Sequence, residues 1–366
     1  MPKADDGFLV PGTAPPADCR GTAAMGVMAV GHAGWDLTLV ALVGATLQCP
    51  ALRAQAGLEP EAVGVVLRLG APGANGLRGY GMGNAMTAST DQSYNPAMVV
   101  RDEPSVAFRH GWTWCDDADD TSFRIGLAEA TVPLSGCDAL KVLYLEVDSG
   151  EEATSLLPIP GSTKEITGKH LGLAYGRRIN ERLSLGVSGA VLLNSDISLR
   201  CPPGTEVAHV SGRAGYDGVR LGAAYQVTDA LQLAAQYDFF TVRAELVDNV
   251  TPARVRKDLR LSDFVSGIEW KPQEQWSVVA ELETGRVSAR GYRKRIDGLR
   301  TGVEYRASDR LALRLGLADG NPTGGIGYED GTWSAGLAWM RDLYEDELGP
   351  TFGSSDTIYL SVGRSL

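Results

Sequence analysis

The stretch Arg78-Gly-Tyr-Gly-Met-Gly83 has the composition of a glycine-rich loop that wraps a phosphate group. A dinucleotide-binding loop needs three glycines at the spacing GxGxxG, a strand before them, a helix after them and a downstream acidic residue. Here the third glycine comes too early for that spacing, and the chain continues through Asn95-Pro96-Ala97 into alternating strands. The glycines instead supply backbone freedom and a small cross-section, which suit a segment packed inside a larger structure.

Nucleophilic catalysis is the next chemistry that the sequence could support. The string nearest to the G-x-S-x-G motif is Gly186-Val-Ser-Gly-Ala190, which lies in the middle of an expected strand rather than at a strand-to-helix turn. An acyl hydrolase built on strands would need a serine and a histidine on neighbouring strands, and His170 is the nearest candidate. We therefore expect no enzyme activity, no catalytic residue and no cofactor.

The five cysteines and the charged residues exclude two further classes of function. The cysteines, at positions 19, 49, 115, 137 and 201, form no CxxC motif and no Cys/His pairing at metal-ligand spacing, so no metal site is expected. The formal net charge is −11, and the sequence contains no run rich in lysine or arginine. Because binding to nucleic acid needs a clustered positive field, we expect no nucleic-acid partner.

The body of the chain, from about residue 105, has apolar residues at every second position. Leu311, Leu313, Leu315 and Leu317 alternate with small or charged residues, which is the pattern of a strand with one apolar face. Four short polar turns repeat one design, in which an aromatic residue ends a strand and a Leu or Trp starts the next. These turns are Tyr175 to Leu183, Tyr225 to Leu231, Trp270 to Trp276 and Tyr305 to Leu311.

Counting the alternating segments gives an all-β protein of about fourteen antiparallel strands. The expected bounds are 105–114, 121–133, 139–147, 167–178, 183–193, 218–227, 231–245, 258–271, 276–288, 295–307, 311–319, 323–329, 333–343 and 357–366. In this numbering the short turns all fall at one end of the strands, and the longer connections (148–166, 194–217, 246–257 and 344–356) fall at the other. This asymmetry is typical of a closed transmembrane barrel with short periplasmic turns, and it places both termini in the periplasm.

A barrel in lipid must be apolar outside, while its lumen tolerates charge. Charged residues on the alternate strand face are therefore expected to line the lumen: Asp238, Glu269, Glu281, Glu283, Arg300, Glu304, Arg306 and Arg314. Aromatic residues at the short turns are expected to form the periplasmic girdle: Tyr175, Tyr225, Trp270, Trp276, Tyr305 and Trp333. A soluble sandwich or propeller would also show a charged face, and ordinary cross-strand pairs would give the same aromatic spacing.

The N-terminal region has the features of a secretory signal. An apolar run over residues 37–47 is too short to span a membrane, and Ala54-Gln55-Ala56 follows as a processing site, so cleavage is expected before Gly57. The alternative is a disordered tail with a short core helix. We therefore divide the chain into an N-terminal extension and signal peptide (1–56), an N-terminal segment (57–104) and a barrel (105–366).

The block from Arg78 to Asp91, followed by Tyr94-Asn-Pro-Ala97, resembles the N-terminal segment of the FadL superfamily of outer-membrane barrels, and the PorV-like branch is the closest. The resemblance implies a fourteen-stranded barrel in the outer membrane of a Gram-negative-type bacterium, with the N-terminal segment inside the lumen as a hatch or plug. The hatch residues that it implies are Arg78, Gly79, Gly81, Met82, Gly83, Asn95, Pro96 and Ala97.

Two functions follow from this resemblance. In FadL-type proteins the hatch gates the passage of small hydrophobic, fatty-acid-like compounds, which leave sideways through a gap in the barrel wall. In PorV-like proteins the barrel instead binds or shuttles a secreted protein. The expected partners are therefore outer-membrane lipid and either a hydrophobic ligand or a secreted protein. In this topology Cys115 and Cys201 share the outer end of the barrel, so they are the pair that could form a disulfide.

Overall fold

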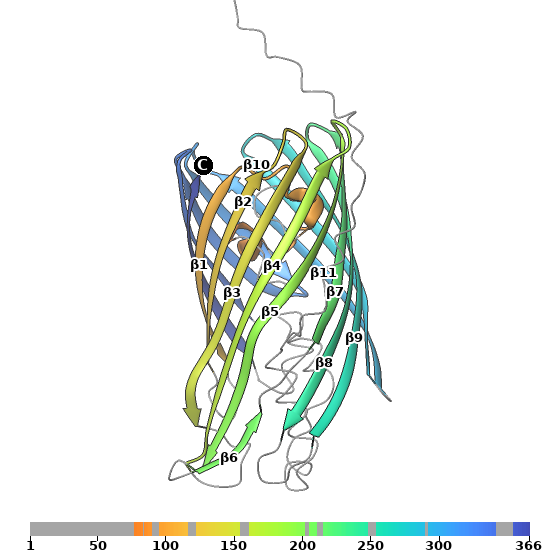
Figure 1. Ribbon diagram of the computed structural model, residues 1–366. Coiled ribbons are helices and arrows are strands. Elements are labelled where there is room, and N and C mark those ends of the chain that lie inside the picture. Colours follow the sequence, from red (N-terminus) through yellow and green to blue (C-terminus); the bar gives the residue numbers. More distant parts are fainter. Residues whose placement is uncertain are drawn as a thin grey trace, which may run out of the picture.

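The structure, a computed structural model, describes residues 77–82, 84–89, 95–115, 122–153, 161–201, 205–210, 215–247, 254–289, 292–341 and 354–366. These residues form one antiparallel sheet of fifteen strands, of which fourteen close into a barrel (Figure 1). Each of the fourteen barrel strands pairs with the barrel strand before it and the one after it, so β5 pairs with β4 and β7, and β1 pairs with β15. The predicted fourteen-stranded barrel is therefore confirmed.

The secondary-structure elements are two short helices and the fifteen strands. The helices are α4 (Leu77–Gly81) and the 3-10 turn η2 (Pro96–Met98). The barrel strands are β1 (Ser105–Cys115), β2 (Ser122–Pro133), β3 (Asp138–Ala153), β4 (Thr163–Arg178), β5 (Leu183–Cys201), β7 (Gly215–Thr228), β8 (Leu231–Val247), β9 (Arg254–Gln273), β10 (Trp276–Ala289), β11 (Tyr292–Arg306), β12 (Leu311–Ala318), β13 (Asn321–Glu329), β14 (Trp333–Arg341) and β15 (Ser355–Ser365). The remaining strand, β6 (Thr205–Val210), pairs with the end of β5.

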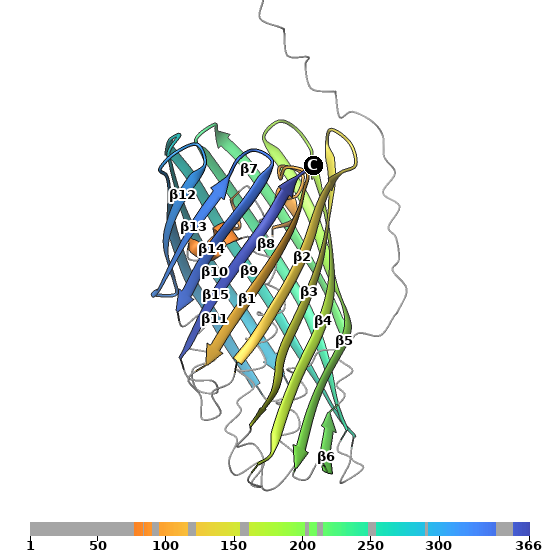
Figure 2. The same ribbon diagram turned by 90° about the vertical axis from the view of Figure 1, so that its left-hand side faces the viewer.

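The two ends of the barrel differ in their connections. One end, which we name the turn end, carries short connections such as 134–137, 179–182, 229–230, 274–275, 307–310 and 330–332. The other end, which we name the loop end, carries β6 and the ends of the longest strands (Figures 1 and 2). None of the described helices is long and apolar enough to cross a membrane.

The loop end is where the sequence-based bounds were wrong. The prediction that 194–217 is a connection missed β6 and the last residues of β5, and β3, β8 and β9 also run further than expected. The predicted bounds relied on alternation between an apolar and a polar face. The end of β3, Asp148 to Glu152, is polar on both faces and lacks that alternation, although its backbone continues to pair with β4. Residues 196–201 of β5 do alternate, so this extension was a signal that the predicted bounds missed.

Polar side chains shape the short turns. Asn180 Oδ1 accepts hydrogen bonds from the backbone N–H groups of Arg182 and Leu183, at 2.9 and 2.8 Å. Asp330 Oδ1 accepts from the N–H groups of Thr332 and Trp333, at 3.0 and 2.7 Å. These side chains replace backbone acceptors in the tight reversal, which explains why Asn and Asp recur in this turn design.

The strands alternate between an exposed apolar face and a buried polar one. Along β9, Phe264, Ile268 and Trp270 are exposed on the outer face, whereas Val265 and Glu269 are buried. Exposed apolar residues recur around the ring, and Leu315 on β12 is 67% exposed. A soluble protein rarely leaves so continuous an apolar surface uncovered, so this outer band is suited to lipid.

One stretch of the barrel wall is not paired. Among the described residues, β5 and β7 pair only from Leu183 opposite Tyr225 to Ser188 opposite Arg220. Beyond this point the other edge of β5 remains paired with β4, and the edge that faced β7 pairs with β6 only from Ile197. Residues 215–219 of β7 remain paired with β8 on their other edge. In Figure 1 the two strands diverge toward the loop end. The wall therefore has two facing strand edges without a shared ladder.

Residues 77–82, 84–89 and 95–102, which we name the inner segment, lie inside the ring. Helix α4 contacts β12 to β15, while η2 contacts β4, β5 and β7 on the opposite side of the barrel. Both views show these elements, coloured orange, within the outline of the barrel (Figures 1 and 2). The side chains of Met82, Met86 and Met98 are completely buried.

Candidate functional site

The first half of the inner segment is held by charge. The Arg78 guanidinium donates from Nη2 to Glu269 Oε1 at 2.9 Å and from Nε to Glu304 Oε2 at 3.0 Å. Glu304 Oε2 also accepts from Arg314 Nε at 2.7 Å, and Glu269 Oε1 accepts from Ser277 Oγ at 2.9 Å. Both carboxylates are 2% exposed. Because one planar guanidinium bridges two wall strands, it fixes α4 in position and orientation.

A third carboxylate, that of Glu281, holds the middle of the inner segment. Glu281 Oε2 accepts from both the backbone N–H and the hydroxyl of Thr87, at 2.9 and 2.6 Å. Its other oxygen accepts from Arg300 Nη1 at 2.8 Å, and Arg300 also pairs with Glu283. Glu281 is therefore paired with a cation of the wall and hydrogen-bonded to the inner segment.

The second half of the inner segment is held by shape. Gly176, Gly186 and Gly222 stand opposite one another on β4, β5 and β7, so they form a row across three adjacent strands. A Cβ atom at any of them would lie within 3.0 Å of the Asn95-Pro96-Ala97 turn or the residues after it. We name these three residues the glycine row. Only glycine permits so close an approach of two backbones.

Asn95 caps the turn that lies on the glycine row. Its Oδ1 accepts from the Ala97 backbone N–H at 3.0 Å, and its Nδ2 donates to the carbonyl oxygens of Thr87 at 3.0 Å and Ala235 at 3.3 Å. The side chain is completely buried. Asn95 therefore joins the turn to the middle of the inner segment and to the wall.

The residues after η2 lead into β1 through further polar contacts. Arg101 donates to Ser184, Gln226 and Gln232 and to the Arg182 carbonyl, at 2.7 to 2.9 Å. Asp102 Oδ2 accepts from Lys141 Nζ at 2.7 Å. These contacts join the end of the inner segment to the wall strands β3, β5, β7 and β8.

An aromatic contact completes the packing of α4. The rings of Tyr80 and Tyr359 are stacked with centroids 4.2 Å apart, and Gly111 leaves the space that the Tyr359 ring occupies. Burial raises the pKa of the Tyr80 hydroxyl to about 12, so Tyr80 is neutral at ordinary pH.

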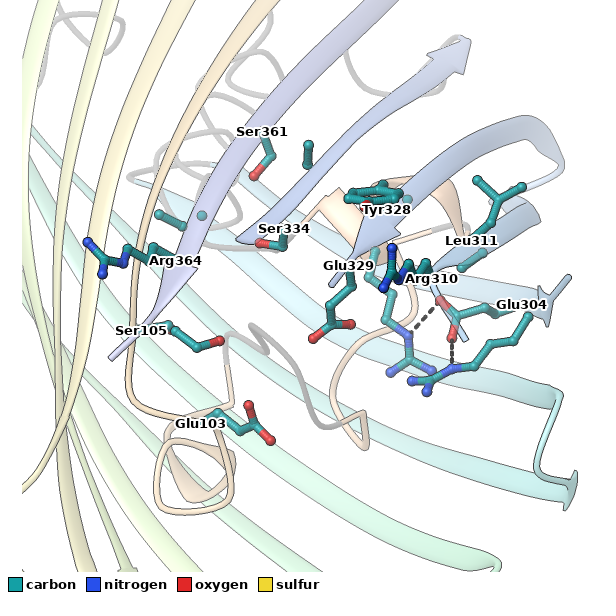
Figure 3. Close-up of a pocket in the computed structure, with 18 of the residues that line it drawn as sticks. Glu103, Ser105, Glu304, Arg310, Leu311, Tyr328, Glu329, Ser334, Ser361 and Arg364 are labelled. Atoms are coloured by element: carbon teal, nitrogen blue, oxygen red, sulfur yellow. Dashed lines mark hydrogen bonds and ion pairs between the residues drawn. The ribbon is translucent and has the colours of Figure 1, made fainter. Parts of the chain in front are cut away.

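A pocket of about 140 Å³ lies beside the inner segment, between the turn-end parts of β11 to β15 and β1. Its lining is rich in charge and includes Arg78, Glu103, Glu304, Arg310 and Glu329. Figure 3 shows Glu304 with two contacts drawn to it, which are those from Arg78 and Arg314. This pocket mixes charged and apolar groups, so it differs from the predominantly apolar cavities that usually bind apolar molecules.

The structure places each remaining residue that the sequence singled out. Asp238, Glu269, Glu281, Glu283, Arg300 and Glu304 are buried, the Arg314 side chain is 11% exposed, and the Arg306 side chain is 53% exposed and lines this pocket. Tyr225, Trp270, Trp276 and Trp333 are exposed, and Tyr175 and Tyr305 are half-buried. Trp276 and Tyr305 also form a direct cross-strand pair with ring centroids 4.7 Å apart.

Several predicted features lie elsewhere. Gly83 and the signal region 1–56 fall outside the described residues. His170 pairs with Leu192 across β4 and β5, and Ser188 pairs with Ala174, so these two residues form no Ser/His pair. The disulfide that the topology allowed between Cys115 and Cys201 is absent, because Cys115 is a buried thiol, whereas Cys137, which the topology left out of a bridge, is disulfide-bonded.

Sequence reasoning missed the glycine row and the contacts of Arg101. Gly176, Gly186 and Gly222 look like ordinary strand glycines, and only the register aligns them. Their positions relative to the strand ends at the short turns give no signal, because Gly176 lies two residues before the end of β4, Gly186 three after the start of β5 and Gly222 six before the end of β7.

The described residues thus form a closed antiparallel barrel with an apolar outer band, a charged interior and a segment of its own chain within it. This is the architecture of transmembrane barrels that hold an N-terminal segment in the lumen. No protein-family model matches the chain, and no curated protein matches it in sequence.

Solved structures do match. The toluene transporter TodX of Pseudomonas putida superimposes with a TM-score of 0.53 at 15% identity, over 79% of this chain and 97% of that chain. A Pseudomonas aeruginosa FadL homologue gives 0.52 at 13%, over 80% and 98%. The monoaromatic hydrocarbon channel CymD gives 0.50 at 14%, over 80% and 98%. The chain has the FadL-type barrel fold, so the predicted resemblance to that superfamily is confirmed at the level of the fold.

Proposed function

We propose that this protein passes small hydrophobic compounds across the outer membrane of a Gram-negative-type bacterium. The proposal is supported by the fold it shares with TodX and CymD, whose names record toluene and monoaromatic hydrocarbons. The carrying observation is that the inner segment is buried inside the turn-end part of the barrel, while among the described residues β5 and β7 pair only from Leu183 opposite Tyr225 to Ser188 opposite Arg220.

In this proposal the outer apolar band lies in the lipid and the turn end faces the periplasm, together with both termini. The six aromatic residues at the short turns then form the girdle at the periplasmic interface of the outer membrane. The eight charged residues of the alternate face line the lumen. Seven of them pair with one another or with Arg78 of the inner segment, and Asp238 pairs with Arg220 of the wall.

Residues 57–104 act as the hatch, and the inner segment is the part of it that the structure describes. Ionic contacts at Arg78 and Glu281 and the glycine row hold the hatch across the lumen. A straight path along the barrel axis would have to break these contacts. In addition, the charged groups that line the pocket beside the hatch would not stabilise a bound hydrophobic molecule.

The unpaired edges of β5 and β7 offer the alternative path. Tyr225 belongs to the girdle, and the last pair, Ser188 and Arg220, lies five residues further along β7. Five residues span about 17 Å along a strand, or about 13 Å of height at the usual tilt, which is roughly half of the 25 Å apolar band. The edges therefore separate at the depth of the lipid chains, where an apolar molecule is stable.

Arg220, at the last β5–β7 pair beside this opening, is already paired. Arg220 donates to both oxygens of Asp238, at 2.8 and 3.0 Å, and Gln236 Nε2 donates to the same carboxylate at 2.9 Å. Because this group is buried and bidentate, a passing molecule meets a neutralised surface rather than an isolated charge.

A cross-link between the two edges tests the path. Extending the register of Ser188 with Arg220 places Val191 opposite Asp217, so the pair Val191→Cys and Asp217→Cys would join the separated edges. The matched control is Leu185→Cys with Ala223→Cys, which are opposite each other in the paired part of the same two strands.

Uptake of radiolabelled toluene and of a long-chain fatty acid would be measured in cells that lack their own transporters. We expect the oxidised Val191/Asp217 cross-link to abolish uptake, a reducing agent to restore it, and the control cross-link to leave it unchanged. Uptake no faster than in cells without the protein would refute the proposed function, and uptake unaffected by the cross-link would refute the sideways path. The predicted alternative of a PorV-like export barrel is not carried further, because no observation in the described part of the chain favours it.

A further inference from the structure

A group of arginines stands out on the outer face of the barrel near the loop end. Arg260 on β9, Arg286 on β10, and Arg293 and Arg295 on β11 are all exposed, and we name them the arginine patch. The three strands are adjacent in the sheet. The patch is unexpected in a chain whose formal net charge is −11.

The strand register brings these cations close together. Arg286 stands directly opposite Arg295, and Ser288 lies between Arg293 on one side and Arg260 on the other. Residues directly opposite in an antiparallel pair have Cβ atoms about 5 Å apart, and like charges there destabilise the sheet. A negatively charged group bound to the patch would therefore stabilise this part of the sheet.

The described chain supplies little of that negative charge. Arg295 pairs with Asp297 at 2.8 Å, and both side chains are more than half exposed. The other three arginines of the patch form no ion pair with any residue that the structure describes. Among the side chains that the structure describes, Asp297 is thus the one carboxylate paired within this group of four guanidinium groups.

The opposite side of the barrel is different. On the outer face of β2 to β4, Arg124 pairs with Asp148 at 3.5 Å and Lys169 pairs with Glu146 at 3.2 Å. Each of these two exposed cations has its own acidic partner. The excess of positive charge on β9 to β11 is therefore a local feature rather than a general property of the rim.

The height of the patch is the same on three strands. Arg260 lies ten residues from Trp270, Arg286 ten from Trp276, and Arg295 ten from Tyr305. Ten residues span about 33 Å along a strand, or about 25 Å of height at a tilt near 40°, which is the full height of the apolar band. If the aromatic residues mark one membrane interface, the arginines stand at the other.

We propose that the arginine patch binds the phosphate groups of an acylated, phosphorylated glycolipid of the outer leaflet, of the lipid A type. The patch faces outward at headgroup depth, directly above the exposed side chains of Leu282 and Leu299, which would contact the acyl chains. Guanidinium groups bind phosphate oxygens in a bidentate manner, which explains why all four cations are arginine. The inference rests on the membrane placement of the barrel and not on what the barrel transports.

Native mass spectrometry of the purified full-length protein in detergent tests this site. The probes are bisphosphorylated lipid A, the same lipid with both phosphates removed, and inorganic phosphate as a competitor. We expect the phosphorylated lipid to bind about tenfold or more tightly than the dephosphorylated one. Millimolar inorganic phosphate should not displace it, because the acyl chains contribute to binding.

Three variants complete the test, each checked for folding by heat-modifiable migration on gels. The triple variant Arg260→Gln, Arg286→Gln, Arg293→Gln should bind the phosphorylated lipid about tenfold more weakly. The corresponding triple Lys variant keeps the positive charge but not the planar, bidentate guanidinium group, so it should lose only part of the affinity for the phosphorylated lipid. The control Arg124→Gln with Lys169→Gln removes two cations from the other side and should bind like the wild type.

Equal binding of the two lipids would overturn the proposal, as would a triple Gln variant that binds like the wild type. An equal loss in the Arg124/Lys169 control would overturn it as well, because the effect would then be one of net charge. Displacement by free phosphate would show that the patch takes the anion and not the lipid. Hydrocarbon uptake by the triple Gln variant should be unchanged, so failure here is distinct from failure of the proposed function.

Discussion

The two halves of the inner segment are held in the barrel by different physics. The first half, around Arg78 and Thr87, is held by buried carboxylates of the wall, Glu269, Glu281 and Glu304. The second half, around the Asn95-Pro96-Ala97 turn, rests on the glycine row. An ion pair keeps most of its attraction when its side chains shift slightly, whereas two backbones in direct contact cannot shift toward each other. The second half should therefore be the fixed end of the segment, and the first half the end that can be released.

The largest expected effect comes from a side chain in the glycine row. In Gly186→Val the new Cβ would overlap the backbone of both Pro96 and Ala97, and neither strand nor turn can move away without breaking its own pairing. We expect η2 to be displaced, at a cost of about 3 kcal/mol or more. Hydrogen–deuterium exchange of residues 95–102 should then become fast.

The control for this substitution is Gly126→Val. Gly126 is also a strand glycine, but no atom lies within 4 Å of the position that a Cβ would take. Exchange of residues 95–102 should therefore be unchanged in this variant. Slow, wild-type exchange in Gly186→Val would show that the glycine row does not hold the turn.

The next effect is that of removing the charge at the other half. Arg78→Met leaves Glu269 and Glu304 buried with one cation fewer, although Arg314 and Ser277 still contact them. Breaking a buried ion pair costs about 3 kcal/mol at the lower end of the usual range. We expect exchange of residues 77–89 to speed up while residues 95–102 stay protected, as measured by the same experiment.

Arg78→Lys sharpens this result. Lysine keeps the positive charge but cannot bridge the two carboxylates with one planar group, so its effect should lie between wild type and Arg78→Met. If Arg78→Met instead released residues 95–102 to the same extent, the two halves would form a single unit and the comparison would fail.

The contrast between the halves also explains what could be predicted from the sequence. Strand positions follow from alternation and from turn residues such as Asn180 and Asp330, which act within a few positions, and all fourteen barrel strands were located. The contacts of Arg78 with Glu269 and Glu304 span 191 and 226 positions, and only the closed ring brings them together. Local patterns thus determine the wall but not the contents of the barrel.

The glycine row shows the same limit more sharply. Gly186 has no feature in the sequence that separates it from Gly126, and the difference between them arises from register and from what lies across the lumen. The unpaired edges of β5 and β7 and the strand β6 were missed for a related reason. Alternation shows which residues of a strand share a face, but it does not show where the pairing with a neighbouring strand ends.

A smaller effect is expected from the cap of the turn. Asn95→Ala removes the acceptor for the Ala97 N–H and the donor to the Thr87 carbonyl, while the glycine row still receives the backbone. The loss should be about 2 kcal/mol, the sum of a cap and a buried hydrogen bond. Exchange of residues 95–102 measures it, and Asn180→Ala, which removes the cap of an exposed turn, should leave that exchange unchanged. No change in Asn95→Ala would mean that the glycine row alone holds the turn.

The smallest effect tests whether the two halves are coupled. Thr87→Val keeps the shape of the side chain and the backbone N–H contact with Glu281 but removes the 2.6 Å hydroxyl contact, which should cost about 1.5 kcal/mol. Thr87 also accepts a hydrogen bond from Asn95 through its carbonyl oxygen, so it is the residue at which the charged half meets the capped turn. If that bond transmits order, the costs of Thr87→Val and Asn95→Ala will not add, and the double variant will show a coupling of about 1 kcal/mol. Additive costs would contradict this link, and the charged half would then be free to open while the turn stays on the glycine row.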